Sequence, residues 1–237
     1  MLSLGVVHAR GGSKRIPHKN IKLLNGYPLI AYIIRAALSS QIDRVIVSTD
    51  DSEIAAIAKK FGAEVPFMRP SEISEDVPSE RVTCHALDWA EANENCNYEV
   101  VVTLQPTTPF IEPSDIDNCL EKLSNNLEIE SCFTAVRVTE PPQWMFAVEG
   151  DLQIAKTFMN GDISGERGVF QELPSLFLPN GGAYASRVKA LRKQNILIAN
   201  PAAIVAVSHE KSVDIDEPID WVLAESIGSL NSFKPLL

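Results

Sequence analysis

The sequence lacks any run of the about 18 apolar residues that a membrane-spanning helix needs. Its first residues also lack the basic-then-apolar order and the small-residue cleavage site of a signal peptide. The four cysteines have no CxxC spacing, which favours reduced, mostly buried thiols over a zinc site or disulfides. A net charge of -10 argues against nucleic acid or a membrane surface as a partner. We therefore expect a cytoplasmic protein with neither kind of partner.

Several common active-site motifs are also missing. The chain has no GxSxG sequence, which argues against a serine hydrolase. It contains neither GxxxxGK[ST] nor GxGxxG, the phosphate loops of P-loop and dinucleotide-binding proteins. The histidines His8, His18, His85 and His209 have no metal-ligand spacing, and no pattern supports a cysteine nucleophile. Any catalytic chemistry must therefore come from other groups.

Apolar runs alternate with helix-like segments over the first half of the 237 residues. We expect strands at 4–8, 44–48, 65–67 and 100–104, and helices at 28–38, 51–61, 78–93 and 113–124. The near-continuous apolar run at 44–48 is typical of a strand covered on both faces, as in parallel sheets. This alternation predicts an α/β fold, a doubly wound, mostly parallel sheet in a single domain spanning 1–237.

The pattern changes after Ser131. We expect further strands at 132–138 and 202–207, a return of the chain to the core at 176–186, and a closing helix at 218–226. The segment 144–174 between them has short strand patterns, glycines and mixed charge. We interpret this segment as an excursion from the sheet, an arm that pairs two subunits.

The most informative stretch is residues 4–20, LGVVHARGGSKRIPHKN. An apolar run ends at the paired glycines Gly11 and Gly12, which let the backbone turn tightly and bring its N–H groups close to a ligand. Four cations surround this turn, in the order Arg10, Lys14, Arg15, Lys19. Positive charge gathered at a strand end in an acidic protein favours a phosphate site. The alternative is a solvated basic turn.

Two carboxylates stand close together late in the chain. Asp214 and Asp216 flank Ile215, and alternate side chains of an extended segment point to the same face. Such a pair can hold one Mg²⁺ together with a ligand phosphate. The alternative is that Asp216 caps the helix expected from Pro218.

Three other polar residues follow strands or form turns. Asp50 follows the strand at 44–48, and its more probable role is to cap the helix at 51–61. Gln105 follows the strand at 100–104, where a polar side chain reads a substrate or pins a turn. Asn180 lies in the turn sequence Pro-Asn-Gly-Gly and reaches either a ligand hydroxyl or its own backbone.

Six segments, which follow one another along the chain, together indicate a known protein family. They are ARGGSKRIPHKN at 9–20, VIVSTDD at 45–51, RPSE at 69–72, LQPTTPF at 104–110, LPNGGAYAS at 178–186 and SVDIDEPIDW at 212–221. With these motifs the chain resembles the CMP-sialic acid synthetases, also called acylneuraminate cytidylyltransferases. The resemblance implies a Rossmann-like nucleotidyltransferase fold and an enzyme that joins CTP to a nine-carbon 2-keto sugar acid. The anomeric hydroxyl of the sugar attacks the α-phosphate, and pyrophosphate leaves with the help of Mg²⁺.

The resemblance also assigns roles to individual residues. Nucleotide phosphates are expected at Ala9, Arg10, Gly11, Gly12, Ser13, Lys14, Lys19 and Asn20, and the cytidine at Arg69 and Ser79. The sugar pocket is expected at Gln105, Asn180 and Tyr184. The metal ligands are Asp214 and Asp216, which act in catalysis with Arg10 and Lys19.

The chain departs from the family in the sugar-binding half. Many members have an arginine where this chain has Phe170, and RPNG is replaced by LPNG through Leu178. Arg167 lies nearby and can take over the sugar carboxylate; otherwise the sugar differs, or a partner subunit supplies the cation. The family also implies a dimerisation arm at about 137–175 and hence a homodimer. The alternatives are a nucleotidyltransferase for another sugar acid, such as an eight-carbon Kdo-like acid, and a non-catalytic homologue that binds CTP or a sugar acid.

Overall fold

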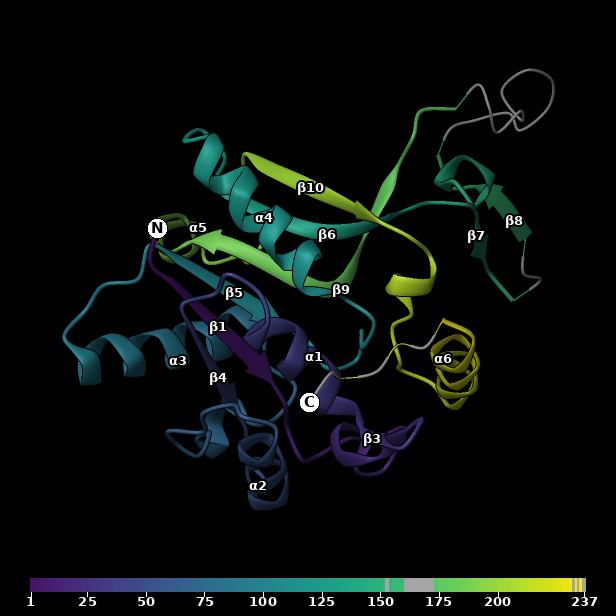
Figure 1. The fold of residues 1–237 in the computed structure, drawn as a ribbon. Helices are drawn as coiled ribbons and strands as arrows, with labels where there is room; N and C mark the ends of the chain where they lie inside the picture. The colour runs from purple at the N-terminus through teal and green to yellow at the C-terminus, as the bar shows by residue number, and fades with distance from the viewer. Residues whose placement is uncertain (152–153, 160–172, 232, 234, 236–237) are drawn as a thin grey trace.

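A six-stranded sheet forms the centre of the protein in the computed structural model, which describes residues 1–151, 154–159, 173–231, 233 and 235 (Figure 1). Its strand order is β10-β6-β9-β5-β1-β4. The strands are β1 (Ser3–His8), β4 (Arg44–Ser48), β5 (Val100–Leu104), β6 (Ser131–Arg137), β9 (Phe177–Arg187) and β10 (Ala202–Val207). The predicted α/β class and mostly parallel sheet are confirmed. β9 is the exception, because it runs antiparallel to both β5 and β6.

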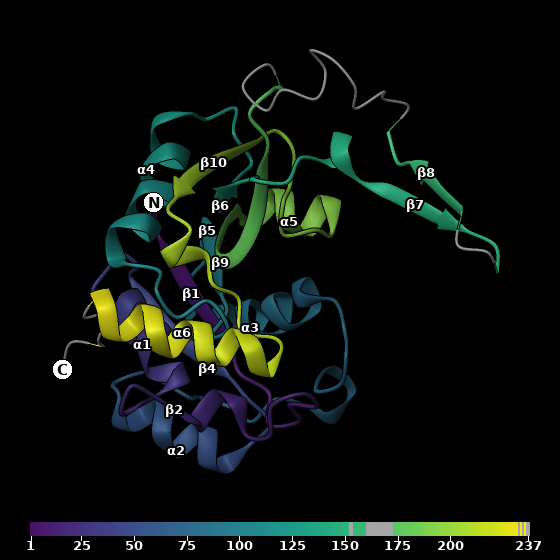
Figure 2. The same cartoon turned by 90° about the vertical axis from the view of Figure 1, so that its right-hand side faces the viewer.

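Helices cover both faces of this sheet. They are α1 (Leu29–Leu38), α2 (Ser52–Lys60), α3 (Ser79–Glu94), α4 (Pro113–Asn125), α5 (Val188–Gln194) and α6 (Pro218–Asn231). Buried side chains of α1, α2 and α4 pack on one face, and those of α3 and α5 on the other. Figure 2 shows α4 and α5 on opposite sides of the strands. All five residues of β5 are buried, which fits its mostly apolar sequence.

A smaller core lies beside the sheet under α6. Leu24, Leu29, Phe110, Ile215 and Trp221 are among its buried members. It joins α6 to the short hairpin of β2 (Leu23–Leu24) and β3 (Tyr27–Pro28). Single 3-10 turns complete the chain at η1 (Lys19–Ile21), η2 (Ser71–Ile73), η3 (Pro142–Trp144) and η6 (Glu210–Ser212).

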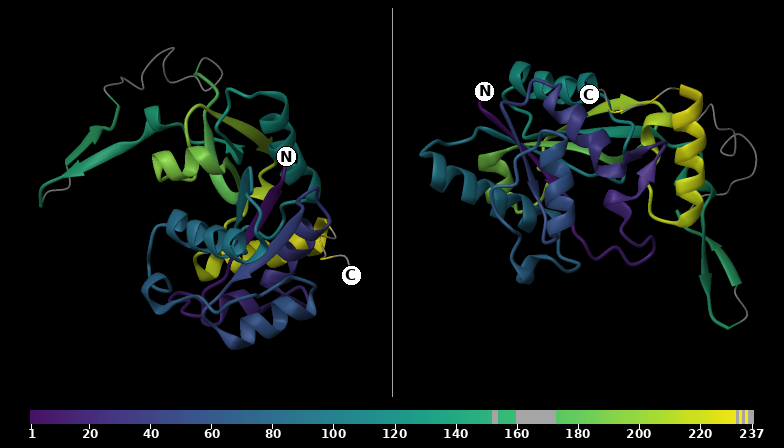
Figure 3. Two further views of the ribbon diagram at one scale, coloured as in Figure 1. Left: turned by 90° about the vertical axis from the view of Figure 1, so that its left-hand side faces the viewer. Right: turned by 60° about the horizontal axis from the view of Figure 1, so that its bottom comes forward.

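One hairpin stands clear of the body of the protein, as Figure 3 shows. It consists of β7 (Phe146–Glu149) and β8 (Ile154–Thr157), which pair antiparallel with each other in a separate sheet. The hairpin lies within the excursion predicted at 144–174 and the arm expected at 137–175. Its role in pairing subunits, and the assignment of 1–237 to a single domain, stay predictions.

Two expected elements differ from those observed. The strand predicted at 65–67 is wrong, and the structure has instead an isolated bridge between Ile46 and Glu64. The physical reason is Pro66, which has no N–H to donate to a ladder. The closing helix extends to Asn231 rather than ending at 226.

No helix in the described part of the chain is long and apolar enough to cross a bilayer. The four cysteines are free thiols; Cys119 and Cys132 are fully buried, and Cys84 and Cys96 are half-buried.

We expect Gly182→Ala to lower the free energy of unfolding by about 1–3 kcal/mol, the usual cost of overpacking a core. A Cβ on Gly182 would overlap the side chain of Ile111 and lie 3.0 Å from Thr134 Oγ1. The control is Gly12→Ala, because a Cβ on Gly12 meets nothing within 4 Å. Urea denaturation measures both, and equal midpoints for the two variants would contradict this packing.

Candidate active site

The carboxyl ends of β1, β4 and β5 lie side by side at one edge of the sheet, because these three strands are parallel neighbours. Ligands of open α/β sheets bind at this edge. A cleft of about 460 Å³ opens there, with walls from the 10–20 loop, from residues 69–82 and from 105–107. It brings together most of the predicted site residues, namely Arg10, Ser13, Lys14, Lys19, Asn20, Arg69, Ser79, Gln105 and Asp216.

The glycine loop, residues 9–20, is held in place by its own backbone and by neighbouring polar side chains. The Ala9 N–H donates to Ser48 O at 3.1 Å, and the Asn20 side chain, which is almost fully buried, donates to Arg10 O at 2.9 Å. The Gly11 N–H donates to Asp50 Oδ1 at 2.9 Å. Gly11 is required here, because a Cβ would lie 2.7 Å from Asp51 Oδ2.

The capping role predicted for Asp50 is wrong. The cap of α2 is Asp51, whose Oδ1 accepts from the N–H groups of Glu53 at 2.7 Å and Ile54 at 3.1 Å. The helix begins at Ser52, one residue later than expected, so the capping position also moves by one. Asp50 is thereby free to orient the glycine loop.

The cations of the loop meet acids from distant parts of the chain. Asp76 pairs with Arg10 at 2.5 Å and with Lys14 at 2.6 Å, and hydrogen bonds from Lys14 and Arg10 hold the pKa of Asp76 below its ordinary value. Arg15 pairs with Glu217 at 3.2 Å. Apart from the half-buried Arg10, these groups are largely solvent-exposed, so each pair stabilises the fold little. Sequence reasoning missed Asp76, because no motif marks it.

Lys19 is fixed more firmly than the other cations. Its side chain is only 14% exposed, and Nζ donates to Ile215 O at 2.6 Å and to Asp216 Oδ1 at 3.1 Å. The contact joins the N-terminal loop to the acidic pair predicted to bind metal.

Arg69 forms the opposite wall of the cleft. It is 6% exposed, and its guanidinium donates to Ser48 Oγ at 3.0 Å and to Ser48 O at 2.5 Å. Burial lowers the pKa of Arg69 to about 10, with repulsion from Arg10 adding to the effect, so the group stays cationic at neutral pH. Ser79 lies beside it as the first residue of α3.

His8 is a cleft residue that sequence reasoning did not single out. It ends β1, directly before the glycine loop, and this position is the signal that could have identified it. Its Nε2 lies 3.0 Å from Thr83 Oγ1, which in turn lies 2.7 Å from Thr103 Oγ1. Burial and the charge of Arg69 lower the pKa of His8 to about 3, so the imidazole is neutral at physiological pH.

The acidic pair flanks Ile215. Ile215 is fully buried and its N–H donates to Thr107 O at 2.8 Å. This anchor fixes the backbone between Asp214 and Asp216. Burial raises the pKa of Asp214, and the charge of Asp216 adds to the effect, while a hydrogen bond with Thr107 opposes it.

The structure argues against the capping role considered for Asp216, while its metal role stays a prediction. Asp220 Oδ2 accepts from the backbone N–H of Asp216 at 3.0 Å and from that of Glu217 at 2.7 Å at the start of α6. The carboxylate of Asp216 faces the glycine loop instead, where it pairs with Lys19 and Arg15.

The donor set of the pair fits Mg²⁺. This ion takes one or two protein carboxylates and completes its shell with phosphate oxygens and water. No group of three or more histidine, cysteine or acidic side chains that could hold a metal exists within the described residues. Asp214 and Asp216 match this preference of Mg²⁺ in kind and number, and their role as metal ligands stays a prediction.

The predicted sugar-binding residues are distributed unevenly. Gln105 lines the cleft, whereas Asn180 and Tyr184, both described, are not among its walls. Asn180 is 5% exposed and hydrogen-bonded within the protein. The Tyr184 ring stacks on Phe133, and burial raises the pKa of Tyr184, with Asp214 adding to the effect. Arg167 and Phe170 lie outside the described residues.

A basic glycine loop, a pinned arginine and an acidic pair at one edge of an α/β sheet define a nucleotidyltransferase site. The chain belongs to the cytidylyltransferase family, whose model matches residues 4–201.

Individual proteins are similar over nearly the whole chain. The CMP-N,N'-diacetyllegionaminic acid synthase of Legionella pneumophila is 31% identical over 98% of both chains. A pseudaminic acid cytidylyltransferase of Campylobacter jejuni is 30% identical, also over 98% of both chains. Among solved structures, a CMP:2-keto-3-deoxy-manno-octonic acid synthetase complexed with CTP has a TM-score of 0.67 at 19% identity. It covers 98% of this chain and 100% of its own, and it supports the same fold.

We expect acid to destabilise the wild type more steeply than His8→Leu. Between pH 6.5 and about 3 the unfolded chain carries a proton on His8 that the folded protein does not. The free energy of unfolding therefore falls with decreasing pH by up to about 1.4 kcal/mol per pH unit from this group. Urea denaturation from pH 7 to pH 4 measures the slope, and an equal slope in the variant would contradict the neutral, buried imidazole.

Proposed function

We propose that this protein transfers the cytidylyl group of CTP to the anomeric hydroxyl of a nine-carbon 2-keto sugar acid and releases pyrophosphate. The observation that carries the proposal is the contact of Lys19 with Asp216 at the strand ends. It brings a cationic loop suited to phosphates against an acidic pair suited to a divalent ion. The names of the relatives, which act on legionaminic and pseudaminic acids, support this class of acceptor.

The glycine loop binds the triphosphate in this proposal. Arg10, Lys14 and Lys19 neutralise phosphate charge, with Ser13 and the N–H group of Gly12 beside them. Asp76, now the partner of Arg10 and Lys14, gives way to the phosphates because it is exposed and weakly held. Nucleotidyl transfer needs such positioning and charge stabilisation more than it needs covalent help.

Arg69 and Ser79 hold the cytidine. The Ser48 contacts fix the guanidinium of Arg69, so it offers its remaining donors to a base oxygen without a loss of side-chain entropy. The neutral His8 adds no charge to this side of the cleft.

Asp214 and Asp216 hold Mg²⁺. The ion supplies positive charge to the phosphate oxygens as pyrophosphate departs. Lys19 contributes a fixed positive charge beside it, and its bond to Ile215 O keeps the ammonium at the boundary between loop and acids.

The sugar acid lies on the side of Gln105, which ends at the same edge of the sheet. A Cβ on Gly181 would lie 3.3 Å from Gln105 Oε1 and 3.6 Å from Asp214 Oδ2, so these groups border one small space. Tyr184 is next to this space, since the charge of Asp214 acts on it. Arg167 remains our proposed ligand of the sugar carboxylate.

We expect pyrophosphate release from CTP, Mg²⁺ and at least one acid in a panel of nine-carbon and eight-carbon 2-keto sugar acids. Asp216→Ala should lower kcat by about 100-fold, a typical loss when one charge-stabilising group is removed. The control is Asp88→Ala, which removes an exposed acid of α3 that pairs with Arg192 of α5. Near-native turnover of Asp216→Ala would remove the metal role. CTP binding with no turnover of any acid would identify a binding homologue instead.

We also propose that the protein is a homodimer joined through the β7–β8 hairpin, with a cytoplasmic location. The hairpin and its flank expose Phe146, Val148 and Phe158 on an element that projects from the described part of the protein. Apolar surface on a projecting element is well suited to a second copy.

We expect Val148→Asp to shift the protein from dimer to monomer, because it places charge within an apolar contact. Sedimentation velocity measures the change. The control is Leu127→Asp, at an exposed leucine remote from the hairpin in sequence, after α4. A wild-type protein that is monomeric at micromolar concentration would refute the arm's role.

A further inference from the structure

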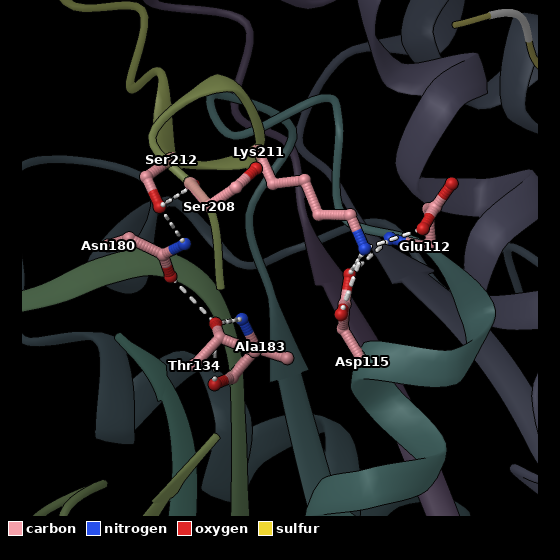
Figure 4. A network of polar contacts seen from close by, with 8 residues as sticks. All are labelled: Glu112, Asp115, Thr134, Asn180, Ala183, Ser208, Lys211 and Ser212. Carbon is pink, nitrogen blue, oxygen red and sulfur yellow. Dashed lines mark hydrogen bonds and ion pairs between the residues drawn. The ribbon is translucent and has the colours of Figure 1, made fainter. Parts of the chain in front are cut away.

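Besides its contacts with Lys19 and Arg15, the segment that carries the two acids is tied to the rest of the protein at three points. Ile215 N donates to Thr107 O, as described above. Lys211 Nζ pairs with Glu112 at 2.5 Å and with Asp115 at 3.0 Å, the two residues of the capping box of α4. Ser212 Oγ accepts from Asn180 Nδ2 at 3.0 Å and donates to Ser208 O at 3.0 Å (Figure 4).

Asn180 occupies an irregular part of the sheet. Phe133 pairs with Tyr184 and Ala135 with Pro179, so residues 180–183 of β9 stand opposite Thr134 alone. Such a bulge bends a strand and re-aims its side chains, often next to an active site. Gly181 has φ of +81°, a left-handed conformation that glycine adopts without strain.

The carboxamide of Asn180 is almost entirely used within the protein. Oδ1 accepts from Thr134 Oγ1 at 2.7 Å and from Gly182 N at 3.1 Å. The Gly182 N–H is an obligate donor, so it identifies the oxygen and leaves Nδ2 toward Ser212. Figure 4 shows this chain running from Thr134 through Asn180 to Ser212. One Nδ2 hydrogen is all that the side chain retains for a ligand.

The bond from Asn180 acts close to the acids. Ser212 precedes Asp214 by two residues, and Gly181, next to Asn180, lies near Asp214 Oδ2. The Thr134 end of this series of hydrogen bonds is rigid, because Thr134 Oγ1 accepts from Ala183 N at 3.0 Å and Asn180 is 5% exposed. The buried strand β9 therefore sets where the segment 212–216 lies.

We propose that Asn180 is a positioning residue, which places Asp214 and Asp216 for metal through its hydrogen bond to Ser212. The inference rests on the proposed function, because it assigns the acids to a metal ion. A residue that orients metal ligands through hydrogen bonds, without touching the metal, typically changes metal affinity by about 10–100-fold.

The test compares Asn180→Ala, Ser212→Ala and the double variant. Mn²⁺ binding in the presence of CTP is titrated by electron paramagnetic resonance, and pyrophosphate release gives kcat and the KM for the sugar acid. We expect each single variant to weaken Mn²⁺ binding by about 10-fold and to lower kcat, with the sugar KM changed less than twofold. The double variant should be no worse than the worse single variant, because both remove one interaction.

Ser226→Ala is the matched control. Ser226 on α6 also donates to the carbonyl four residues earlier, Val222 O at 2.9 Å, as Ser212 does to Ser208. It lies on an exposed turn of the helix outside the bonds in Figure 4. We expect wild-type values for all three measured quantities.

A higher sugar KM for Asn180→Ala, with unchanged Mn²⁺ binding and no effect of Ser212→Ala, would overturn the inference in favour of a sugar contact. Additive effects in the double variant would overturn it as well. If Asn180→Ala fails to fold, Ser212→Ala still decides, since it leaves β9 intact. A wild type that binds Mn²⁺ without releasing pyrophosphate refutes the proposed function, while the Mn²⁺ titrations continue to test the positioning role.

Discussion

The short contact between the ammonium of Lys19 and the segment Ile215–Asp216 joins positions almost 200 residues apart, and the organisation of the cleft depends on it. A mostly buried cation cannot be left without acceptors, because desolvation would then be uncompensated. Lys19 finds them in a backbone carbonyl and a carboxylate that lie at the cleft only because α6 packs on Phe110 and the β2–β3 hairpin. The packing of this small apolar core therefore also brings the charged groups of the site together.

The cleft combines two kinds of charged group. Lys14 and Arg15, which are largely exposed, and the half-buried Arg10 pair with acids that a phosphate can replace. Arg69 and Lys19 are held by backbone oxygens that no ligand displaces, so their positions are set before any ligand arrives. Preorganised charge of the second kind stabilises a transition state, while the first kind adapts to the triphosphate. The cytidylyltransferase family to which the chain belongs needs both.

Much of the architecture was readable in the residues. The mostly apolar strands predicted a sheet covered on both faces, and the glycine loop lies at its edge as expected. The predictions were wrong where a single residue changed the local secondary structure. Pro66 removed a donor and with it a strand, and a helix that starts at Ser52 moved the cap from Asp50 to Asp51. These errors are small, because the propensity of a segment predicts the element itself, whereas the ends of a helix or strand depend on single hydrogen bonds.

The sequence by itself determined the fold class, the cationic turn and the spacing of Asp214 and Asp216, since periodicity and adjacency are properties of the chain alone. The tertiary structure decided which distant groups meet. It set Asp76 against Arg10, turned the carboxylate of Asp216 toward Lys19 instead of the helix, and committed the Asn180 carboxamide to Ser212. The physical reason is that an ion pair or hydrogen bond depends on separation in space, and the antiparallel insertion and bulge of β9 follow from packing between strands.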